Sequence, residues 1–212
     1  RVITNRSSGK MGVALAEECY MQGAEVLLLE SVTAASSNMH QDTSGVAGMQ
    51  GFPRGGGIRT EVFETAKNLK NLIKEYVKDY NVIFHAAAVS DFVSEKRVEG
   101  KIDSFLPFNL RLHPAPKILD QIKSWNPKIL LIGFKAVYKL SDNDLVSAGM
   151  KKLRESSSDY IVVNDVGRAG IGFGTRDNEV YIINPRGLLN KITKAPKSEV
   201  ARKILECVFQ DV

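Results

Sequence analysis

The sequence is poor in several residue types, and each shortage narrows the range of possible functions. It has two cysteines, Cys19 and Cys207, one tryptophan and three histidines among 212 residues. Two cysteines set among apolar residues give no disulfide framework, which predicts a protein of the reducing cytoplasm. No apolar run approaches the roughly 20 residues that span a bilayer, and no signal peptide is visible. The missing initiator methionine suggests a fragment or a processed chain.

The few histidines also argue against metal-centred or histidine-centred chemistry. His40, His85 and His113 lie far apart in the sequence and show no metal-ligand spacing. No nucleophile elbow and no Cys-His signature accompanies them. We therefore predict that the histidines face solvent or are satisfied structurally, and that no set of side chains binds a metal directly.

Charge of one sign does not dominate the chain. The 29 Lys and Arg residues against 24 Asp and Glu residues leave a net charge of +5. Four lysines between residues 67 and 78 recur opposite an apolar stripe, which is typical of a solvated helix face. No helix-turn-helix, zinc-finger or aromatic RNA-binding signature is present, so neither a nucleic-acid partner nor a membrane partner is expected. The small excess of positive charge suits a small polyanionic substrate.

Apolar runs and helical patterns alternate along the chain and predict an α/β fold. We expect a Rossmann-like, doubly wound, mostly parallel sheet with helices on both faces, as a single domain over residues 1–212. Segments 31–57 and 94–107 are expected to form a mobile loop and a flexible flap. The expected strands are 2–4, 25–29, 58–62, 82–87, 108–112, 129–134, 160–163 and 179–183, the last at a sheet edge. The first expected helix follows the turn at 5–9 and ends near residue 22, before Gly23. The other expected helices cover about 65–79, 116–124, 142–155 and 198–209.

A glycine turn follows the first expected strand and suits a phosphate ligand. In Ser7-Ser8-Gly9-Lys10-Met11-Gly12, the two glycines match the second and third glycines of the dinucleotide fingerprint. Gly9 would let a ligand approach the backbone, and Gly12 would let the helix pack on the strand. Glu30 ends the second expected strand where a ribose-binding acid would sit. Met11 excludes a P-loop, and a tight turn without a ligand is the alternative.

The segment His85-Ala86-Ala87-Ala88-Val89-Ser90-Asp91 ends the fourth expected strand. Its alanines leave room for a ligand in the sheet crevice, and Asp91 is suited to bind a hydroxyl group. Similar segments occur in short-chain dehydrogenases, so an NAD(P)-binding oxidoreductase is the enzymatic alternative. That class needs a tyrosine with a lysine four residues later. None of the tyrosines after residue 90 has such a lysine, which counts against hydride transfer.

Several segments together resemble the phosphopantothenate-cysteine ligases (phosphopantothenoylcysteine synthetases) of coenzyme A biosynthesis. They follow the family's order and cover nearly the whole chain. The opening dodecapeptide and the Ala-Ala-Val-Ser-Asp stretch are the specific ones. The matching segments are 1–12, 86–92, 101–102, 116–119, 132–136, 152–153, 163–166 and 177–180.

The resemblance implies a ligase that activates 4'-phosphopantothenate with a nucleoside triphosphate, usually CTP. An acyl-cytidylate and pyrophosphate would form with Mg2+ held through the phosphates, and the amine of L-cysteine would then displace CMP. A carboxylate needs a good leaving group before an amine can attack it, and the polyphosphate needs cations and N–H donors. The resemblance also implies a homodimer and a fused or associated flavin-dependent decarboxylase domain.

The resemblance further assigns roles to individual residues. Asn5 matches the catalytic asparagine at the acyl phosphate, and Arg1 an arginine near the same substrate. The turn Ser7, Ser8 and Gly9 is expected to bind substrate or phosphate. The residues expected at the nucleotide are Ala87 and Ala88 in the crevice, Asp91 at the ribose, Lys101 as the catalytic flap lysine, Pro116 and Phe134 at the base, and Lys152 at a phosphate.

Some of these roles have structural alternatives, and two positions depart from the family pattern. Phe134 also suits a core aromatic, and Lys101 a solvated loop lysine. Val137 stands where the family often has Glu, and Ser156 where it often has a second lysine. The loss of that lysine predicts one fewer triphosphate contact, so ATP is an alternative to CTP. A catalytically silent nucleotide-binding partner is the third hypothesis.

Overall fold

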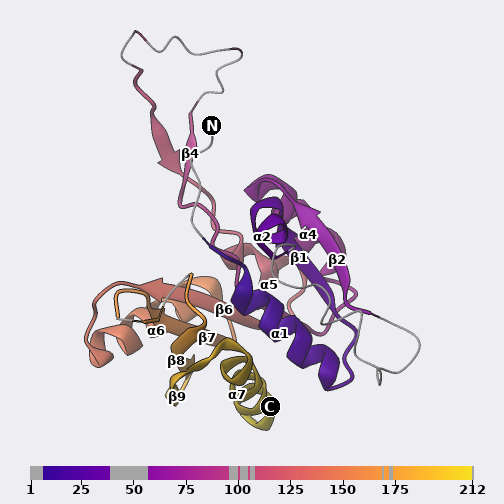
Figure 1. Cartoon of the computed structure of the whole chain (residues 1–212), viewed down its shortest axis with the longest axis vertical. Coiled ribbons are helices and arrows are strands. Elements are labelled where there is room, and N and C mark those ends of the chain that lie inside the picture. The colour runs from indigo at the N-terminus through magenta and orange to yellow at the C-terminus, as the bar shows by residue number, and fades with distance from the viewer. Residues whose placement is uncertain are drawn as a thin grey trace.

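A five-stranded sheet forms the centre of the molecule (Figure 1). The computed structural model describes residues 7–38, 57–95, 100, 105, 108–168, 170–171 and 174–211. The first three strands of the sheet are parallel, and the last two are added antiparallel. In spatial order the strands are β3 (Val82–His85), β6 (Leu130–Val137), β7 (Tyr160–Asp165), β8 (Asp177–Asn184) and β9 (Gly187–Pro196).

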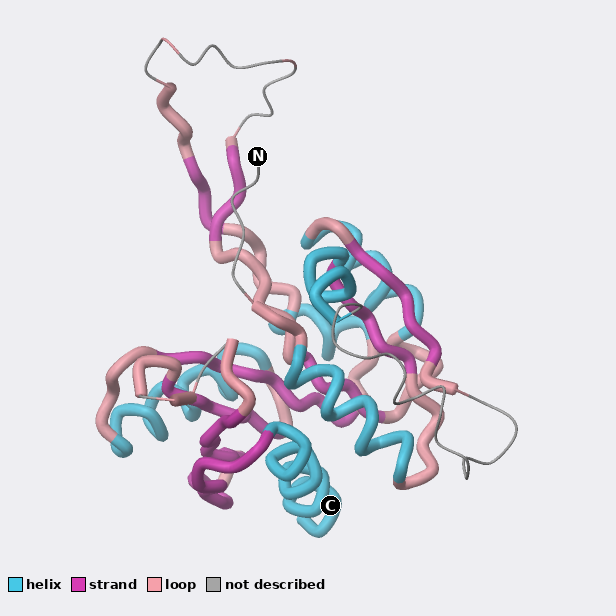
Figure 2. Tube along the Cα trace, in the orientation of Figure 1, coloured by secondary structure: helices cyan, strands magenta, loops and turns pink. Residues whose placement is uncertain are grey.

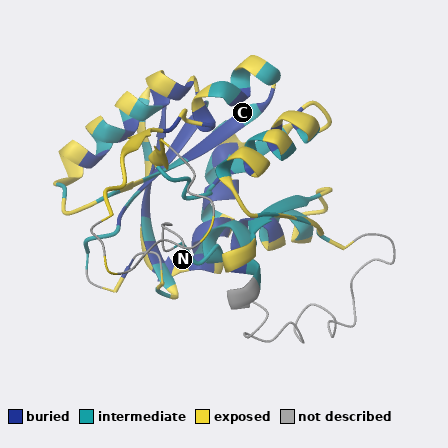
Figure 3. Ribbon diagram, turned by 90° about the horizontal axis from the view of Figure 1, so that it is seen from above, coloured by how far each residue is buried: buried dark blue, intermediate teal, exposed yellow. Residues whose placement is uncertain are grey.

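Helices cover both faces of this sheet. Figure 3 shows the buried strands between helices whose outer faces are exposed. Each face has its own apolar cluster, one against α1 and α7 and the other against α4, α5 and α6. The predicted Rossmann-like α/β fold is therefore confirmed. The helices are α1 (Lys10–Met21), α4 (Ala66–Tyr76), η1 (Leu119–Gln121, a 3-10 turn), α5 (Ile122–Trp125), α6 (Asp142–Ser156) and α7 (Lys197–Asp211).

The central strands are apolar on both sides because both faces are covered. Leu131, Ile132 and residues 161–163 are completely buried, as expected for parallel strands between two helical layers. In α7 the predicted line of Val200, Ile204 and Val208 is also completely buried. Gly23, predicted to follow the first helix, adopts a left-handed conformation with φ of 88°.

A second, smaller pair of parallel strands lies beside α4 (Figure 1). It consists of β1 (Leu27–Ser31) and β2 (Arg59–Phe63). Helix α2 (Val32–Asn38) follows β1 directly, so the prediction of a loop from residue 31 was wrong at its start. Residues 39–56 of that predicted loop lie outside the described residues, as does the predicted strand 2–4.

Strands β4 (Phe92–Ser94) and β5 (Leu112–Pro114) form an antiparallel ladder that projects from the body as an arm (Figure 2). The strand predicted over 108–112 starts only at Leu112 and ends at Pro114, which pairs with Phe92 in the ladder. Large apolar side chains are exposed along the arm. They are Phe92, Val93, Phe105, Phe108, Leu110 and Leu112, with Phe105 the most exposed at 94%.

The sheet edge differs from the prediction. Strand β8 was expected at the edge, but β9 pairs with it on the outer side. The sequence of β9 was missed because only Ile192 and Ala195 in it are buried, among exposed polar residues such as Lys191 and Lys194. Such charged side chains are typical of an edge strand, where they discourage pairing with other chains.

None of the helices in the described part of the chain is both long and apolar enough to cross a bilayer.

Candidate functional site

The glycine turn before α1 has the backbone geometry expected of an anion-binding turn. Gly9 is the N-cap of α1 and adopts a left-handed conformation with φ of 69°, which favours glycine. Glycine offers no side-chain oxygen to cap the first turn, and the first turn has no acidic residue. The first N–H groups and the positive end of the helix dipole therefore remain suited to a phosphate. Ser7 and Ser8 lie immediately before this turn.

Gly12 was predicted to let α1 pack on the first strand. Among the described residues, nothing lies within 4 Å of a Cβ built on Gly12. The strand itself lies outside the described residues, so this prediction remains a prediction.

Positive charge gathers next to the same turn, in a depression of about 540 Å³ between α1 and the start of α7. Its cations are Lys10, Arg176 and Lys197, and Glu17 lines it as well. Burial, with a smaller contribution from Lys10, lowers the pKa of Lys197, which is 8% exposed. The depression extends the positive surface around the glycine turn, and none of the predicted nucleotide residues lines it.

Two ion pairs tie the segments that follow β3 and precede β6 to each other and to α6. Lys117 binds Asp91, whose side chain is 71% exposed, and the N–H of Ala115 donates to the Asp91 carbonyl oxygen at 2.8 Å. Lys152 of α6 binds the carboxylate of Asp120 at 2.6 Å. The short segment 115–121 supplies a partner to both pairs and is braced by a bond from Gln121 to the Lys117 carbonyl oxygen at 3.0 Å.

This arrangement brings several of the predicted nucleotide residues together. Pro116 belongs to segment 115–121, and Asp91 and Lys152 each form an ion pair with it, although Asp91 and Lys152 lie 61 residues apart in the sequence. Ala87 packs on the side of the sheet covered by α4 to α6, and Ala88 is partly buried beside it. Phe134 is partly buried against the opposite cluster, under α1 and α7, and its contact with the base remains a prediction.

Three predicted site residues, Arg1, Asn5 and Lys101, lie outside the described residues. Their roles remain predictions. Most of the predicted flap at 94–107 is also outside the described residues.

The prediction that the histidines are satisfied or solvent-facing was wrong for His85. Its side chain is buried, with 9% of the residue exposed, and its Nε2 has no hydrogen-bond partner among the described residues. Burial lowers the pKa of His85 to about 4. A backbone hydrogen bond of His85 and the charge of Asp120 oppose this effect, whereas the charge of Lys152 strengthens it. His113 is exposed on the arm, 3.6 Å from Glu95, and His40 lies outside the described residues.

Sequence reasoning therefore missed His85, Lys117 and Asp120 as parts of this region. Each adjoins or belongs to a segment that was recognised: His85 precedes the alanines, and the other two belong to or follow the 116–119 segment. A polar residue at the carboxyl end of a strand was a usable signal for His85, whereas Lys117 and Asp120 carried none.

The two departures from the family pattern lie inside the fold. Ser156 is almost fully buried, and its hydroxyl donates to the Lys152 carbonyl oxygen and contacts the Ser158 hydroxyl, both at 2.7 Å. Val137 is partly buried against the cluster under α6. A serine at 156 therefore continues the α6 packing rather than extending a cation from the helix.

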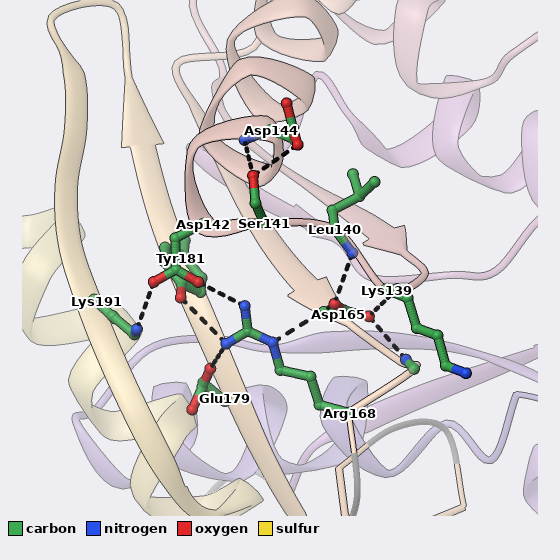
Figure 4. Close-up of polar contacts among 11 residues, drawn as sticks. Lys139, Leu140, Ser141, Asp142, Asp144, Asp165, Arg168, Glu179, Tyr181 and Lys191 are labelled. Carbon is green, nitrogen blue, oxygen red and sulfur yellow. Dashed lines mark hydrogen bonds and ion pairs between the residues drawn. The ribbon is translucent and has the colours of Figure 1, made fainter.

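A carboxylate network flanks the region at the end of β7 (Figure 4). The Asp165 side chain is 2% exposed and accepts bonds from the N–H groups of Lys139, Leu140 and Gly167 at 2.8–3.1 Å. Burial alone would raise the pKa of Asp165, but these bonds and the charge of Arg168 lower it. This network explains Asp165 in the matching 163–166 segment as a structural residue.

Arg168 joins the network to its neighbours. It pairs with Asp142 at 2.6 Å, with Asp165 at 3.6 Å and with Glu179 of β8 (Figure 4). Lys191 of β9 reaches the same Asp142 carboxylate at 2.9 Å. The bonds from Lys191 and Arg168 lower the pKa of Asp142. The start of α6 is thus bound to both antiparallel strands.

Other chemistries find little support among the described residues. No group of three His, Cys, Asp or Glu side chains is placed to hold a metal there. Both cysteines are free, and burial raises the pKa of Cys19 to about 11, which disfavours a reactive thiolate. The Tyr160 hydroxyl donates to the Asp211 carboxylate at 2.7 Å, and Tyr160 lies far in the sequence from the alanine segment that suggested an oxidoreductase.

Comparison with known proteins gives several relatives that match nearly the whole chain. The coenzyme A biosynthesis bifunctional protein CoaBC of Thermococcus kodakarensis is 36% identical over 206 residues, covering 96% of this chain and 45% of the relative. The protein of the same description from Methanocaldococcus jannaschii is 34% identical over 208 residues, covering 98% and 46%. The chain thus spans about half the length of these curated relatives.

A solved structure and a family model give the same picture. The structure, a DNA/pantothenate metabolism flavoprotein from Streptococcus pneumoniae, has a TM-score of 0.79 at 25% identity and covers 100% of this chain and 92% of that one. The family model for the DNA/pantothenate metabolism flavoprotein C-terminal domain matches residues 1–212. The resemblance found in the sequence is confirmed: the chain belongs to the family of the DNA/pantothenate metabolism flavoprotein C-terminal domain.

Proposed function

We propose that residues 1–212 form a phosphopantothenate-cysteine ligase domain of coenzyme A biosynthesis, as one part of a longer bifunctional chain. The observation that carries this proposal is the segment 115–121. It holds Asp91 through Lys117 and Lys152 through Asp120, so that residues from three family segments are tied to one stretch of chain. Leu119 in that stretch packs on Gly133, the register partner of His85 at the carboxyl end of β3. In open α/β sheets this edge is where ligands bind.

The chemistry of the region supports a substrate with several phosphates. The turn at Gly9 offers N–H groups, and Lys10, Arg176 and Lys197 add positive charge beside it. Lys152 is a further cation near the β3 end. The two activated groups of the proposed reaction, a triphosphate and an acyl phosphate, both need such donors as charge develops.

In the proposed reaction, the 4'-phosphopantothenate carboxylate attacks the α-phosphate of CTP and pyrophosphate leaves. The amine of L-cysteine then attacks the acyl-cytidylate, CMP leaves, and the new amide loses one proton. Asp91 binds the ribose, Pro116 and Phe134 bound the base, and Lys101 offsets phosphate charge in the first step. Asn5 contacts the acyl phosphate in the second, with Arg1 near the same substrate and the turn Ser7, Ser8 and Gly9 at the phosphate.

Mg2+ belongs to this proposal as an ion that the nucleotide phosphates hold. The described residues provide no cluster of three protein ligands for a metal, and the cations near the Gly9 turn suit phosphate oxygens. When bound, the ion would offset phosphate charge as pyrophosphate leaves.

The test incubates the protein with 4'-phosphopantothenate, L-cysteine, Mg2+ and either CTP or ATP, and follows pyrophosphate and amide. We expect product with CTP, and a comparison of the two nucleotides decides the preference. Asn5→Ala should accumulate the acyl-nucleotide, and Lys101→Ala should block its formation. Failure of both nucleotides would overturn the proposal, and quenching of NADPH fluorescence would favour the oxidoreductase alternative.

We also propose a cytoplasmic homodimer, associated with or fused to a flavin-dependent decarboxylase domain. The arm supports the dimer, because its exposed apolar side chains would be covered by a second copy. The two free cysteines suit a reducing compartment. Sedimentation of the protein and of a Phe92→Ser/Leu112→Ser variant tests the dimer. A monomer in both samples would contradict it.

A further inference from the structure

A buried imidazole nitrogen without a hydrogen-bond partner lies on the side of the sheet that carries the Lys152–Asp120 ion pair. Buried polar groups in proteins are nearly always bonded, so an exception needs a reason. His85 is such an exception, since its Nε2 makes no bond to any described residue. The proposed ligase roles do not use this side chain.

The position of His85 on β3 brings it to the face of the sheet that η1 and α6 cover. Side chains alternate along a strand, and Ile83, two residues earlier, packs in the cluster under α4 to α6. Val82 and Phe84 pack in the opposite cluster. His85 therefore lies on the same side of the sheet as Asp120 and Lys152.

Gly133 opens the space above His85 to η1. It is the register partner of His85 on the neighbouring strand β6. A Cβ on Gly133 would lie 2.8 Å from Leu119 Cδ2, so η1 rests directly on this glycine. Asp120 follows Leu119 in the same turn, and the charges of both Asp120 and Lys152 act on the His85 imidazole.

The ion pair above His85 is shielded enough for its rearrangement to matter. The Lys152 side chain is 16% exposed and that of Asp120 is 31% exposed. A phosphate that takes Lys152 would leave the Asp120 carboxylate without its cation. A partly buried carboxylate that loses its cation is less stable than a paired one, so moving Lys152 alone would oppose nucleotide binding.

We propose that His85 is the second partner of Asp120: the carboxylate holds Lys152 while the site is empty, and accepts a hydrogen bond from His85 Nε2–H when a nucleotide phosphate takes the lysine. The nucleotide-bound state rests on the proposed function, whereas the exchange of partners does not. His85 is then a positioning residue. Its Nε2–H forms no hydrogen bond in the free protein and donates to Asp120 in the complex.

The exchange can be tested without nucleotide. In Lys152→Met, Asp120 has lost its cation, so the His85 Nε2 should already be hydrogen-bonded. The readout is the 15N imidazole spectrum of protein labelled only on histidine, which has three residues to resolve. His85→Gln identifies the signal. Lys152→Met/Asp120→Ala, which removes the acceptor, should return it to the free position, and His113 on the arm is the internal reference.

The nucleotide arm uses the unsubstituted protein. CTP with Mg2+ should move the His85 Nε2 signal to its position in Lys152→Met. Binding of CTP with an unchanged His85 signal, or an unchanged signal in Lys152→Met, would overturn the inference and leave the ligase proposal standing. Absence of any CTP effect on the backbone spectrum would contradict the ligase proposal and the nucleotide-bound half, while the Lys152→Met result would still decide the exchange.

Steady-state kinetics separate positioning from packing. His85→Leu keeps the volume but cannot donate, and we expect its KM for CTP to rise about 3- to 10-fold. His85→Gln can donate through its amide and should restore most of that loss. The KM for L-cysteine should change in neither variant. Equal KM values for CTP in the Leu and Gln variants would contradict the role of the hydrogen bond.

Discussion

Lys117 pairs with the Asp91 carboxylate, and the N–H of Ala115, two residues earlier, donates to the Asp91 carbonyl oxygen at 2.8 Å. Both the backbone and the side chain of Asp91 are therefore tied to one short segment. The proposed ribose contact of Asp91 depends on this tie for its orientation, because the side chain is otherwise exposed.

Replacing Lys117 by Met should weaken nucleotide binding without loss of stability. The pair is exposed at both ends, and such pairs contribute about 0–1 kcal/mol to stability. We expect the KM for CTP to rise about 3- to 10-fold while Tm changes by less than about 3 °C. Lys128→Met, at an exposed position after α5, is the control. A lower Tm with unchanged KM would show that the pair serves the fold instead.

Asp165 should contribute more to stability than Arg168. Asp165→Ala leaves three N–H groups at the end of β7 without their acceptor, which we expect to cost about 3–5 kcal/mol. Arg168→Ala keeps those bonds and should cost about 1–3 kcal/mol. Urea denaturation measures both. Lys151→Ala, which removes an exposed pair 3.9 Å long, should change the free energy of unfolding by less than about 0.5 kcal/mol. The reverse order for the first two variants would contradict this account of the network.

His85 should make the protein less stable as the pH falls below about 6.5. The pKa of His85 is about 4 in the folded protein and about 6.5 in the unfolded chain. As the pH falls, the unfolded chain therefore binds the proton before the folded protein does. The loss therefore develops between pH 6.5 and 4, and should reach about 2–3 kcal/mol by pH 4.5. Denaturation of the protein and of His85→Leu at pH 7 and 4.5 gives the difference that belongs to His85. Parallel losses in the two proteins would rule out this contribution.

Gly149 should not tolerate a methyl group. A Cβ there would lie 2.2 Å from Ile183 Cδ1 and 2.8 Å from Val163 Cγ2, where α6 meets the sheet. Despite the better helix propensity of alanine, Gly149→Ala should lower stability by about 1–3 kcal/mol. Ser147→Ala, on the exposed side of the same helix, should be neutral or slightly stabilising. A more stable Gly149→Ala variant would show that α6 moves away at no cost.

The fold class and the main helices could be predicted because their patterns are strong. Few alternatives are left by the line Val200, Ile204 and Val208 and by the apolar runs 129–134 and 160–163. Strand β9 could not be found in this way, since one of its faces is solvated and carries lysines. Helix α2 was missed because its Ser, Thr and Ala residues resemble a loop composition.

The site was predictable where residues belong to motifs and unpredictable where they meet through space. Asp91 and Lys152 were expected from their segments. Their partners Lys117 and Asp120 follow from the path of one short segment, which no local pattern encodes. His85 was misjudged because a histidine next to alanines gives no sign of whether its Nε2 will find a partner.

The order of elements after residue 129 has a consequence for how the chain folds. Strands β6, β7, β8 and β9 are neighbours both along the chain and in the sheet, and α7 then packs back on them. Each of these pairings closes a shorter stretch of chain than the β3–β6 pairing, which spans residues 86–129, so the block should form early and open late. Amides of residues 161–163 should then exchange with solvent only through global unfolding, whereas the half-buried β1–β2 pair, with its own small ladder, should open at lower free energy.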